Sequence, residues 1–287
     1  MCGNGFVEGK QVKRGYVKPY GSPWIAVDYA DADGLAIFEG CIILGETAKV
    51  EQSARQIDQQ IAAMPELLKD SSVQTRGAGI VGAQYRWKNR TVPYEIAPDV
   101  PNPKRIHDAA DHWNQHSSMR FVVRTTEPDY VRVVRDNRGC ASLVGRQGGC
   151  QQLVLGDFCT VGNLIHEFGH TVGLWHEQCR IDRDKWVRID SDNVSPDKMF
   201  NFSQQIAQTL DLNGYDYGSI MHYPANAFGV TPKSITIVPL QPLPPGVVMG
   251  QRNALSAGDI AAVEALYAGV AAPAPLPAAM PTQAAHG

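Results

Sequence analysis

The stretch His166–Glu177 reads His-Glu-Phe-Gly-His-Thr-Val-Gly-Leu-Trp-His-Glu and contains three histidines. His166 and His170 are four residues apart, so a helix would place both on one face, close enough to bind one metal ion. Gly173 has no Cβ and can turn the chain out of the helix at positive φ, which would return His176 to the same point. Three histidine ligands leave a fourth position open, a pattern typical of a catalytic rather than a structural zinc site.

Glu167 directly follows the first histidine and should project toward the same cavity. We expect it to act as the general base that takes a proton from the zinc-activated water, and not as a metal ligand. A bare His-Glu-x-x-His pair also occurs in unrelated helices as an ordinary pair of histidines. The longer spacing that includes Gly173 and His176 is far more restrictive and is the motif of the metzincin peptidases.

The residues around this motif resemble the astacin family of metzincin endopeptidases. Glu177 follows the third histidine, and Ser219–Tyr223 reads Ser-Ile-Met-His-Tyr. The similarity runs from about Ala78 to Tyr267, most of the chain. It implies an α+β fold, namely a two-lobed metzincin-like catalytic domain with a mixed sheet and the zinc helix in the N-terminal lobe. The C-terminal lobe is expected to be largely irregular, and a propeptide should precede the domain.

The resemblance also implies roles for three further residues. Met221 would pack beneath the histidines, where a flexible thioether fills an irregular apolar gap. Tyr223 would bind zinc in the resting enzyme and swing away to donate a hydrogen bond to the oxyanion. Glu177 would pair with the ammonium group of the N-terminus that processing creates. Without the resemblance, Glu177 would be an ordinary carboxylate that supports a metal ligand or lies solvated at a helix end.

Three segments are expected along the chain: a propeptide over residues 1–77, an astacin-like catalytic domain over 78–267, and a tail over 268–287. Residues 78–87 resemble the beginning of mature astacins, and Arg76 lies in a polar, Gly-containing stretch that suits an exposed processing loop. The tail is rich in Ala and Pro with almost no charge, which predicts disorder.

The propeptide contains the sequence Phe38-Glu39-Gly40-Cys41. Astacin precursors carry a Phe-x-Gly-Asp motif whose aspartate blocks the zinc in place of water. In this chain Cys41 stands at that position, and a thiolate is a soft, strong zinc ligand. We therefore expect Cys41 to bind the zinc in the latent form only. The alternative is a buried or disulfide-bonded cysteine.

The six cysteines allow 15 pairings, among which the sequence alone does not choose. The resemblance implies a disulfide between Cys140 and Cys159. It leaves Cys150 and Cys179 as an additional bridge, with Cys41 and the cysteine at position 2 unpaired. Such bonds require an oxidising compartment.

Local patterns predict further elements. Apolar residues at helical intervals predict one amphipathic propeptide helix, bent near Pro65. The expected helices are Val50–Lys69, Ile106–Gln115, Pro196–Ser203 and Ala257–Tyr267, the last capped by Ser256. The expected strands are Phe121–Arg124, Tyr130–Val134 and Leu153–Leu155.

Charge and hydropathy exclude several classes of function. The 287 residues carry 26 basic and 29 acidic side chains, interspersed, with a net charge of −3, so no nucleic-acid partner is indicated. No apolar run approaches the roughly 18 residues of a membrane span. We expect a secreted or extracytoplasmic enzyme, although the first residues lack the apolar region of a signal peptide. Cys2 is an alternative anchor, as the modified cysteine of a lipoprotein.

The predicted function is therefore a zinc-dependent endopeptidase with one zinc ion per chain, made as a latent precursor. Its partners are protein or peptide substrates and an activating protease. Substrates should lie extended beside Cys140–Val144 and add a strand to that sheet edge. Their preferred side chains depend on loops within Arg180–Asn213 and Pro224–Gly250. Two alternatives are a zinc amidase acting on cell-wall peptides and a catalytically inactive zinc-binding module.

Overall fold

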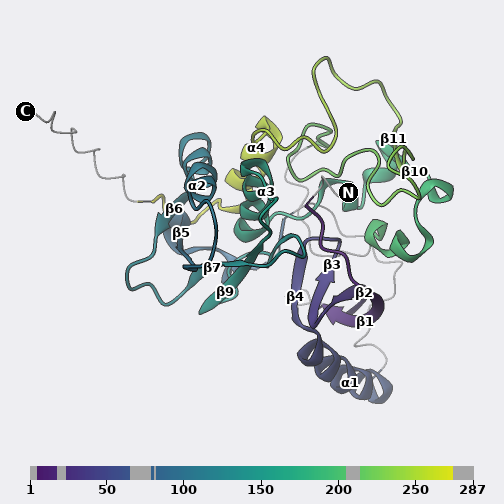
Figure 1. The fold of residues 1–287 in the computed structure, drawn as a ribbon, viewed down its shortest axis with the longest axis horizontal. Helices are drawn as coiled ribbons and strands as arrows, with labels where there is room; N and C mark the ends of the chain where they lie inside the picture. Colours follow the sequence, from purple (N-terminus) through teal and green to yellow (C-terminus); the bar gives the residue numbers. More distant parts are fainter. Residues whose placement is uncertain (1–4, 18–23, 65–78, 81, 205–213, 274–287) are drawn as a thin grey trace, which may run out of the picture.

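The structure is a computed structural model that describes residues 5–17, 24–64, 79–80, 82–204 and 214–273 (Figure 1). Its centre is a nine-stranded mixed sheet in the order β1-β2-β3-β4-β8-β9-β7-β5-β6. The strands are β1 (Gln11–Val17), β2 (Ile25–Ala32), β3 (Leu35–Phe38), β4 (Ile42–Glu46), β5 (Thr91–Ile96), β6 (Arg120–Val123), β7 (Tyr130–Arg135), β8 (Cys140–Ser142) and β9 (Cys150–Leu155). The α-helices are α1 (Thr47–Ala63), α2 (Lys104–His116), α3 (Val161–Val172) and α4 (Ala257–Leu266).

The expected propeptide continues the sheet of the expected catalytic domain. Strands β1 to β4 form an antiparallel meander, and β4 then pairs in parallel with β8 at Ile42 and Ser142. In β2 the side chains of Ile25, Val27 and Tyr29 are buried and those between them are less so, which is the alternation of a half-buried strand. The sequence analysis did not identify these four strands.

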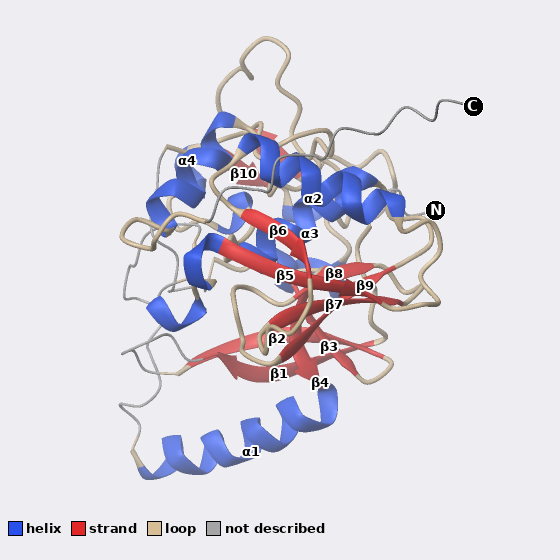
Figure 2. Ribbon diagram, turned by 90° about the vertical axis from the view of Figure 1, so that its left-hand side faces the viewer, coloured by secondary structure: helices blue, strands red, loops and turns tan. Residues whose placement is uncertain are grey.

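Helices α2, α3 and α4 lie on one side of the sheet, and α1 lies on the other side against the meander (Figure 2). Helices α2 and α3 share a core in which the Phe121 and Phe168 rings stack, with centroids 4.3 Å apart. Trp113 of α2 is fully buried and donates from Nε1 to the carbonyl of Ile165 in α3 at 3.0 Å. These contacts fix α3, the helix that carries the metal-binding motif.

Beyond His176 the described chain is mostly irregular, as expected for a C-terminal lobe. It contains short 3₁₀ helices, including Pro196–Phe202, and a small sheet of β10 (Val187–Ile189) and β11 (Ile237–Pro239). The chain then returns through α4, which packs on the core of the N-terminal lobe. The α+β fold with a mixed sheet is thus confirmed.

The predicted elements of the catalytic region match the observed ones to within two residues at most ends. The main exception is the strand expected at Leu153–Leu155, which begins earlier, at Cys150. The propeptide helix begins at Thr47 and ends at Ala63, and residues 65–69 of its expected range lie outside the described part. Among the described residues, no helix is both long and apolar enough to cross a membrane.

Candidate active site

Helix α3 positions His166, Glu167 and His170, and its two ends are fixed by local chemistry. Thr160 caps the N-terminus in a capping box with Asn163, each side chain bonding the backbone N–H of the other. At the C-terminus Gly173 has φ 113°, a backbone conformation that residues with a Cβ rarely adopt. The positive φ predicted at this glycine is thus present. The turn that follows brings His176 back toward the helix.

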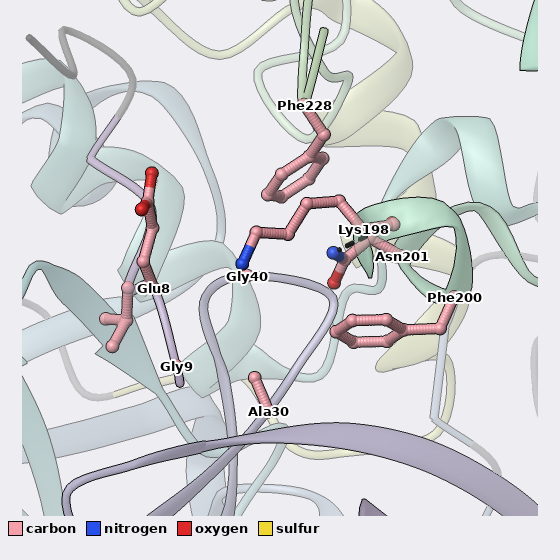
Figure 3. Close-up of a pocket in the computed structure, with 9 residues that line it drawn as sticks. Glu8, Gly9, Ala30, Gly40, Lys198, Phe200, Asn201 and Phe228 are labelled. Atoms are coloured by element: carbon pink, nitrogen blue, oxygen red, sulfur yellow. Dashed lines mark hydrogen bonds between the residues drawn. The ribbon is translucent and has the colours of Figure 1, made fainter. Parts of the chain in front are cut away.

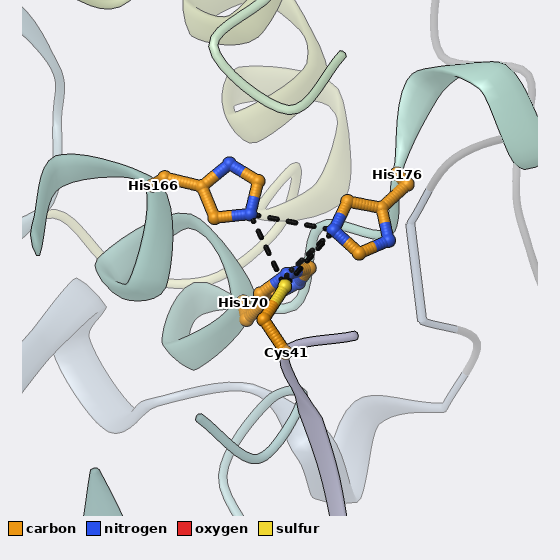
Figure 4. Close-up of side chains that lie close together, drawn as sticks. All are labelled: Cys41, His166, His170 and His176. Atoms are coloured by element: carbon orange, nitrogen blue, oxygen red, sulfur yellow. Dashed lines mark hydrogen bonds between the residues drawn. The ribbon is translucent and has the colours of Figure 1, made fainter. Parts of the chain in front are cut away.

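Four donor atoms converge on one buried point (Figure 4). The Nε2 atom of His176 lies 3.2 Å from that of His170 and 3.3 Å from that of His166. The Sγ atom of Cys41 lies 3.5, 3.3 and 3.1 Å from the Nε2 atoms of His166, His170 and His176. All four residues are buried. The structure thus brings the expected propeptide cysteine to the three histidines of the motif.

The ring nitrogens that face away from this point are all hydrogen-bonded. His166 Nδ1 donates to the carbonyl of Ile220 and His170 Nδ1 to that of Leu174, each at 2.8 Å. A carbonyl only accepts, so the proton sits on Nδ1 and the lone pair of Nε2 points to the centre. Burial lowers the pKa of His170 to about 4, which keeps its imidazole neutral as metal binding requires.

Such a cluster of lone pairs fits a bound cation. Without one, Nε2 atoms 3.2–3.3 Å apart would repel each other and leave buried acceptors unpaired. A tetrahedral zinc with bonds of about 2.0–2.1 Å to nitrogen and about 2.3 Å to sulfur separates its ligand atoms by about 3.3–3.6 Å. The observed separations lie close to this range, so the residues present fit a zinc ion.

Met221 packs against α3 at Gly169, the residue before His170. A Cβ added at Gly169 of α3 would collide with the Sδ atom of Met221, so only glycine allows this approach. Asp259 of α4 stabilises the turn that contains Met221. Its carboxylate accepts hydrogen bonds from Ser219 Oγ at 2.6 Å and from the N–H of Ile220 at 2.9 Å. The sequence analysis missed Asp259, although Ser256 and Asp259 form a second capping box that signals it.

Tyr223 is fully buried beside the cluster, with its ring centroid 4.6 Å from that of His176. Its hydroxyl donates to the backbone carbonyl of Glu39 at 2.6 Å, and its N–H donates to Gln178 Oε1 at 3.0 Å. Burial raises the pKa of Tyr223 well above its usual value, so the phenol stays protonated and remains a donor. In this structure Tyr223 therefore bonds a peptide carbonyl of the expected propeptide.

The carboxylate of Glu167 is buried within α3. Its Oε2 atom has no hydrogen-bond partner among the residues that the structure describes. Burial raises the pKa of Glu167 well above its usual value. A carboxylate with a free oxygen and a raised pKa is suited to accept a proton and release it again.

Glu177 is buried, and its contacts are with residues of the expected catalytic domain. Its Oε1 atom accepts from the N–H of Asp216 at 2.8 Å and lies 3.5 Å from Nη1 of Arg180. Ile80 donates its N–H to the carbonyl of Gly173 at 2.8 Å, so this segment runs along the end of α3. Residue 78 and the expected cleavage region lie outside the described residues, and the pairing of Glu177 with a new N-terminus remains a prediction.

The disulfide prediction is half right. Cys140 and Cys159 form a bond with their Cα atoms 6.3 Å apart, which ties β8 to the loop before α3. The expected bridge between Cys150 and Cys179 is wrong, because both are free thiols: Cys150 is exposed at the start of β9, whereas Cys179 is buried in a hydrophobic cluster. Cys41 is also a free thiol, so the disulfide-bonded alternative for it does not apply. The cysteine at position 2 lies outside the described residues.

Comparison with known proteins identifies the family. A family model described as astacin, a peptidase family, matches residues 80–268. The chain belongs to the astacin family. Zinc metalloproteinase nas-12 of Caenorhabditis elegans is 38% identical over 199 residues, covering 67% of this chain and 52% of the relative. Bone morphogenetic protein 1 of Xenopus laevis is 36% identical over 191 residues, covering 63% of this chain and 27% of that protein.

A solved astacin structure is also similar. High choriolytic enzyme 1, a hatching enzyme zinc-protease from Oryzias latipes, has a TM-score of 0.60 and 36% identity, covering 67% of this chain and 99% of that one. The chain thus spans about half of the nematode relative's length and about a quarter of the frog protein's. The astacin match begins at residue 80 and leaves out β1 to β4 and Cys41.

Proposed function

We propose that this chain is a zinc endopeptidase held latent by its own N-terminal segment. The zinc ligands are His166, His170 and His176, with the thiolate of Cys41 as a fourth ligand in the precursor only. The observation that carries the proposal is the position of Cys41 Sγ, within 3.1–3.5 Å of all three Nε2 atoms. One such cluster among the described residues corresponds to one zinc ion per chain.

The bound zinc would polarise the scissile carbonyl and lower the pKa of a water molecule. Glu167 accepts the proton of that water on its free carboxylate oxygen and then delivers it to the departing amine. Tyr223 donates its hydroxyl hydrogen bond to the oxyanion. Its present bond to the carbonyl of Glu39 supports this role, because a peptide carbonyl is already the acceptor.

Latency in this proposal has a second component besides the thiolate. The N–H of Ser142 in β8 donates to the carbonyl of Cys41 at 3.0 Å, and β4 pairs with β8. An extended substrate adding to β8 would need the same edge. The N-terminal segment therefore blocks both the metal and the strand that should align the substrate.

Activation then requires cleavage between about Arg76 and Ala78, by another protease or by a second copy of the chain. The loss of residues 1–77 removes Cys41 and frees β8. A secreted or extracytoplasmic location fits the Cys140–Cys159 disulfide, which forms in oxidising compartments. Protein or peptide substrates follow from the family.

Digestion of casein tests the function. Purified precursor, cleaved precursor and a cleaved Glu167→Gln variant are incubated with casein, and the fragments are identified by mass spectrometry. The proposal expects internal peptide-bond cleavage by the cleaved wild-type enzyme alone. A parallel incubation uses purified bacterial cell wall. Digestion of that cell wall with casein left intact would instead support the amidase alternative.

A further inference from the structure

A second N-terminal segment, Gly5–Val7, lies along β8 beside Cys41. The N–H of Cys140 donates to the carbonyl of Gly5 at 2.8 Å, two residues before the bond between Ser142 and Cys41. Residues two apart in a strand direct their N–H groups to the same edge. Val7 donates its N–H to the carbonyl of Gly40 at 2.7 Å, which joins the two segments. The carbonyls of Gly5 and Cys41 thus accept hydrogen bonds from the β8 N–H groups that an extended substrate would otherwise use.

The side chain of Phe6 enters an aromatic pocket next to Tyr223. Its ring centroid is 4.7 Å from that of Phe228 in a stacked arrangement and 4.9 Å from that of Tyr223 in an edge arrangement. Phe202 closes the pocket, 6.0 Å from Phe228 and 6.1 Å from Tyr223. Phe6 is only 8% exposed, so the pocket buries it almost completely.

The fit between the N-terminal segment and this pocket is close. A Cβ added at Gly40, which has φ +70°, would lie 2.8 Å from Cζ of Phe228 and 3.1 Å from Cδ1 of Phe6. The backbone therefore runs directly over the pocket, as that of a bound peptide would. Phe202, Tyr223 and Phe228 all lie in the expected catalytic domain and remain when residues 1–77 are removed.

An adjoining cavity extends this site (Figure 3). It is small and open to solvent, with room for about one water molecule. In Figure 3 the side chain of Lys198 crosses the cavity between the rings of Phe228 and Phe200. Its lining comes from both sides of the interface: Val7, Glu8, Gly9, Ala30 and Gly40, and Lys198, Phe200, Asn201 and Phe228. The Nζ atom of Lys198 lies 3.2 Å from the carboxylate of Asp197, so its charge is balanced by a neighbour.

We propose that the pocket of Phe202, Tyr223 and Phe228 is a specificity subsite of the mature enzyme that takes a large apolar side chain of the substrate, with Phe and Tyr preferred. This inference rests on the proposed function. Aromatic side chains gain from stacked and edge contacts with the three rings, and Phe6 holds the site in the precursor. Since Tyr223 also reaches the scissile carbonyl, the preferred side chain stands at one fixed position close to the cleaved bond.

Cleavage profiling of the wild-type mature enzyme tests the proposal without a variant. The enzyme digests a proteome-derived peptide library, and its cut sites are read by mass spectrometry. Phe, Tyr, Leu or Met should be enriched at a single position, with Lys and Arg depleted there. Abundant cleavage without apolar enrichment at any position would overturn the inference and leave the proposed function intact. The absence of any cleavage would overturn the proposed function and this inference with it.

Variants then assign the preference to the pocket. Phe202→Leu keeps an apolar side chain but removes a ring, and should lower kcat/KM for a Phe-containing peptide about 10-fold relative to its Ala analogue. The matched control is Phe158→Ala, at a ring that is 51% exposed and outside the pocket. An unchanged ratio in Phe202→Leu would show that another site makes the selection.

Discussion

The carboxylate of Glu39 accepts a hydrogen bond from Nδ1 of His176 at 2.8 Å, and both side chains are fully buried. A residue of the expected propeptide thus orients a histidine of the candidate metal centre. Carboxylates that accept from the outer nitrogen of a metal-bound histidine fix its ring and raise its basicity. This contact ends when the N-terminal segment leaves.

Substitution of Glu39 should destabilise the precursor. Glu39→Ala leaves the buried N–H of His176 without its acceptor, at a cost of about 1–3 kcal/mol. Glu39→Gln keeps an amide oxygen as acceptor and should cost less. Urea denaturation of the two precursor variants measures both values. Equal stability of Glu39→Ala and the wild type would show that the contact contributes nothing.

Removal of the Cys41 thiol should weaken latency. Cys41→Ala leaves the fourth metal position open, so the uncut precursor should cleave a fluorogenic peptide above the wild-type background. Cys41→Asp supplies a carboxylate ligand and should restore part of the latency. A mercurial, which binds the thiol, should activate the wild type but not Cys41→Ala. If Cys41→Ala is as silent as the parent, latency rests on the blocked β8 edge alone.

Glu167→Gln should retain zinc and fold but lose turnover, because an amide cannot accept the proton of the water. Zinc content by atomic absorption and casein cleavage are measured on the same cleaved sample. His170→Ala is the companion variant, since it should lose the metal as well. Substantial turnover by Glu167→Gln would assign the general base to another group.

Tyr223→Phe should lower kcat by about 10²–10³-fold with a smaller effect on KM, as for the loss of one oxyanion donor. The phenyl ring keeps the aromatic contacts of Tyr223 with Phe202 and Phe228, which remain in the cleaved enzyme. Steady-state kinetics on the cleaved enzyme give both constants. A wild-type kcat would restrict the tyrosine to a packing role.

Asp259→Ala should destabilise the fold through the turn that carries Met221. The variant loses the bond that the carboxylate accepts from the N–H of Ser256, one half of the capping box of α4, and the bonds to Ser219 and Ile220, about 2–4 kcal/mol in total. Asp108→Ala is the matched control, because its ion pair with Lys104 is exposed and worth about 0.3–0.5 kcal/mol. Thermal unfolding of both variants compares the two losses.

The parts of the site that the sequence predicted are those set by local geometry. Helical spacing places His166 and His170 on one face, and Gly173 is needed for a positive φ. Cys41 was predicted because it belongs to a family motif of four consecutive residues, which the sequence shows directly.

The parts that were missed depend on contacts between distant segments. Strand β4 pairs with β8 about 100 residues away, and Glu39 meets His176 across 137 residues. In both cases the residues around one partner do not indicate which distant residue it contacts. The Cys150–Cys179 bridge was wrong for the same reason, since pairing depends on distance in the fold.

The central claim is that the thiolate of Cys41 binds the same zinc ion as the three histidines in the uncut precursor. X-ray absorption at the zinc edge measures this ligand set directly, before and after removal of residues 1–77. The account predicts one sulfur at about 2.3 Å and three nitrogens at about 2.0–2.1 Å in the precursor, with the sulfur lost after cleavage. A precursor whose zinc has only nitrogen and oxygen ligands would contradict it.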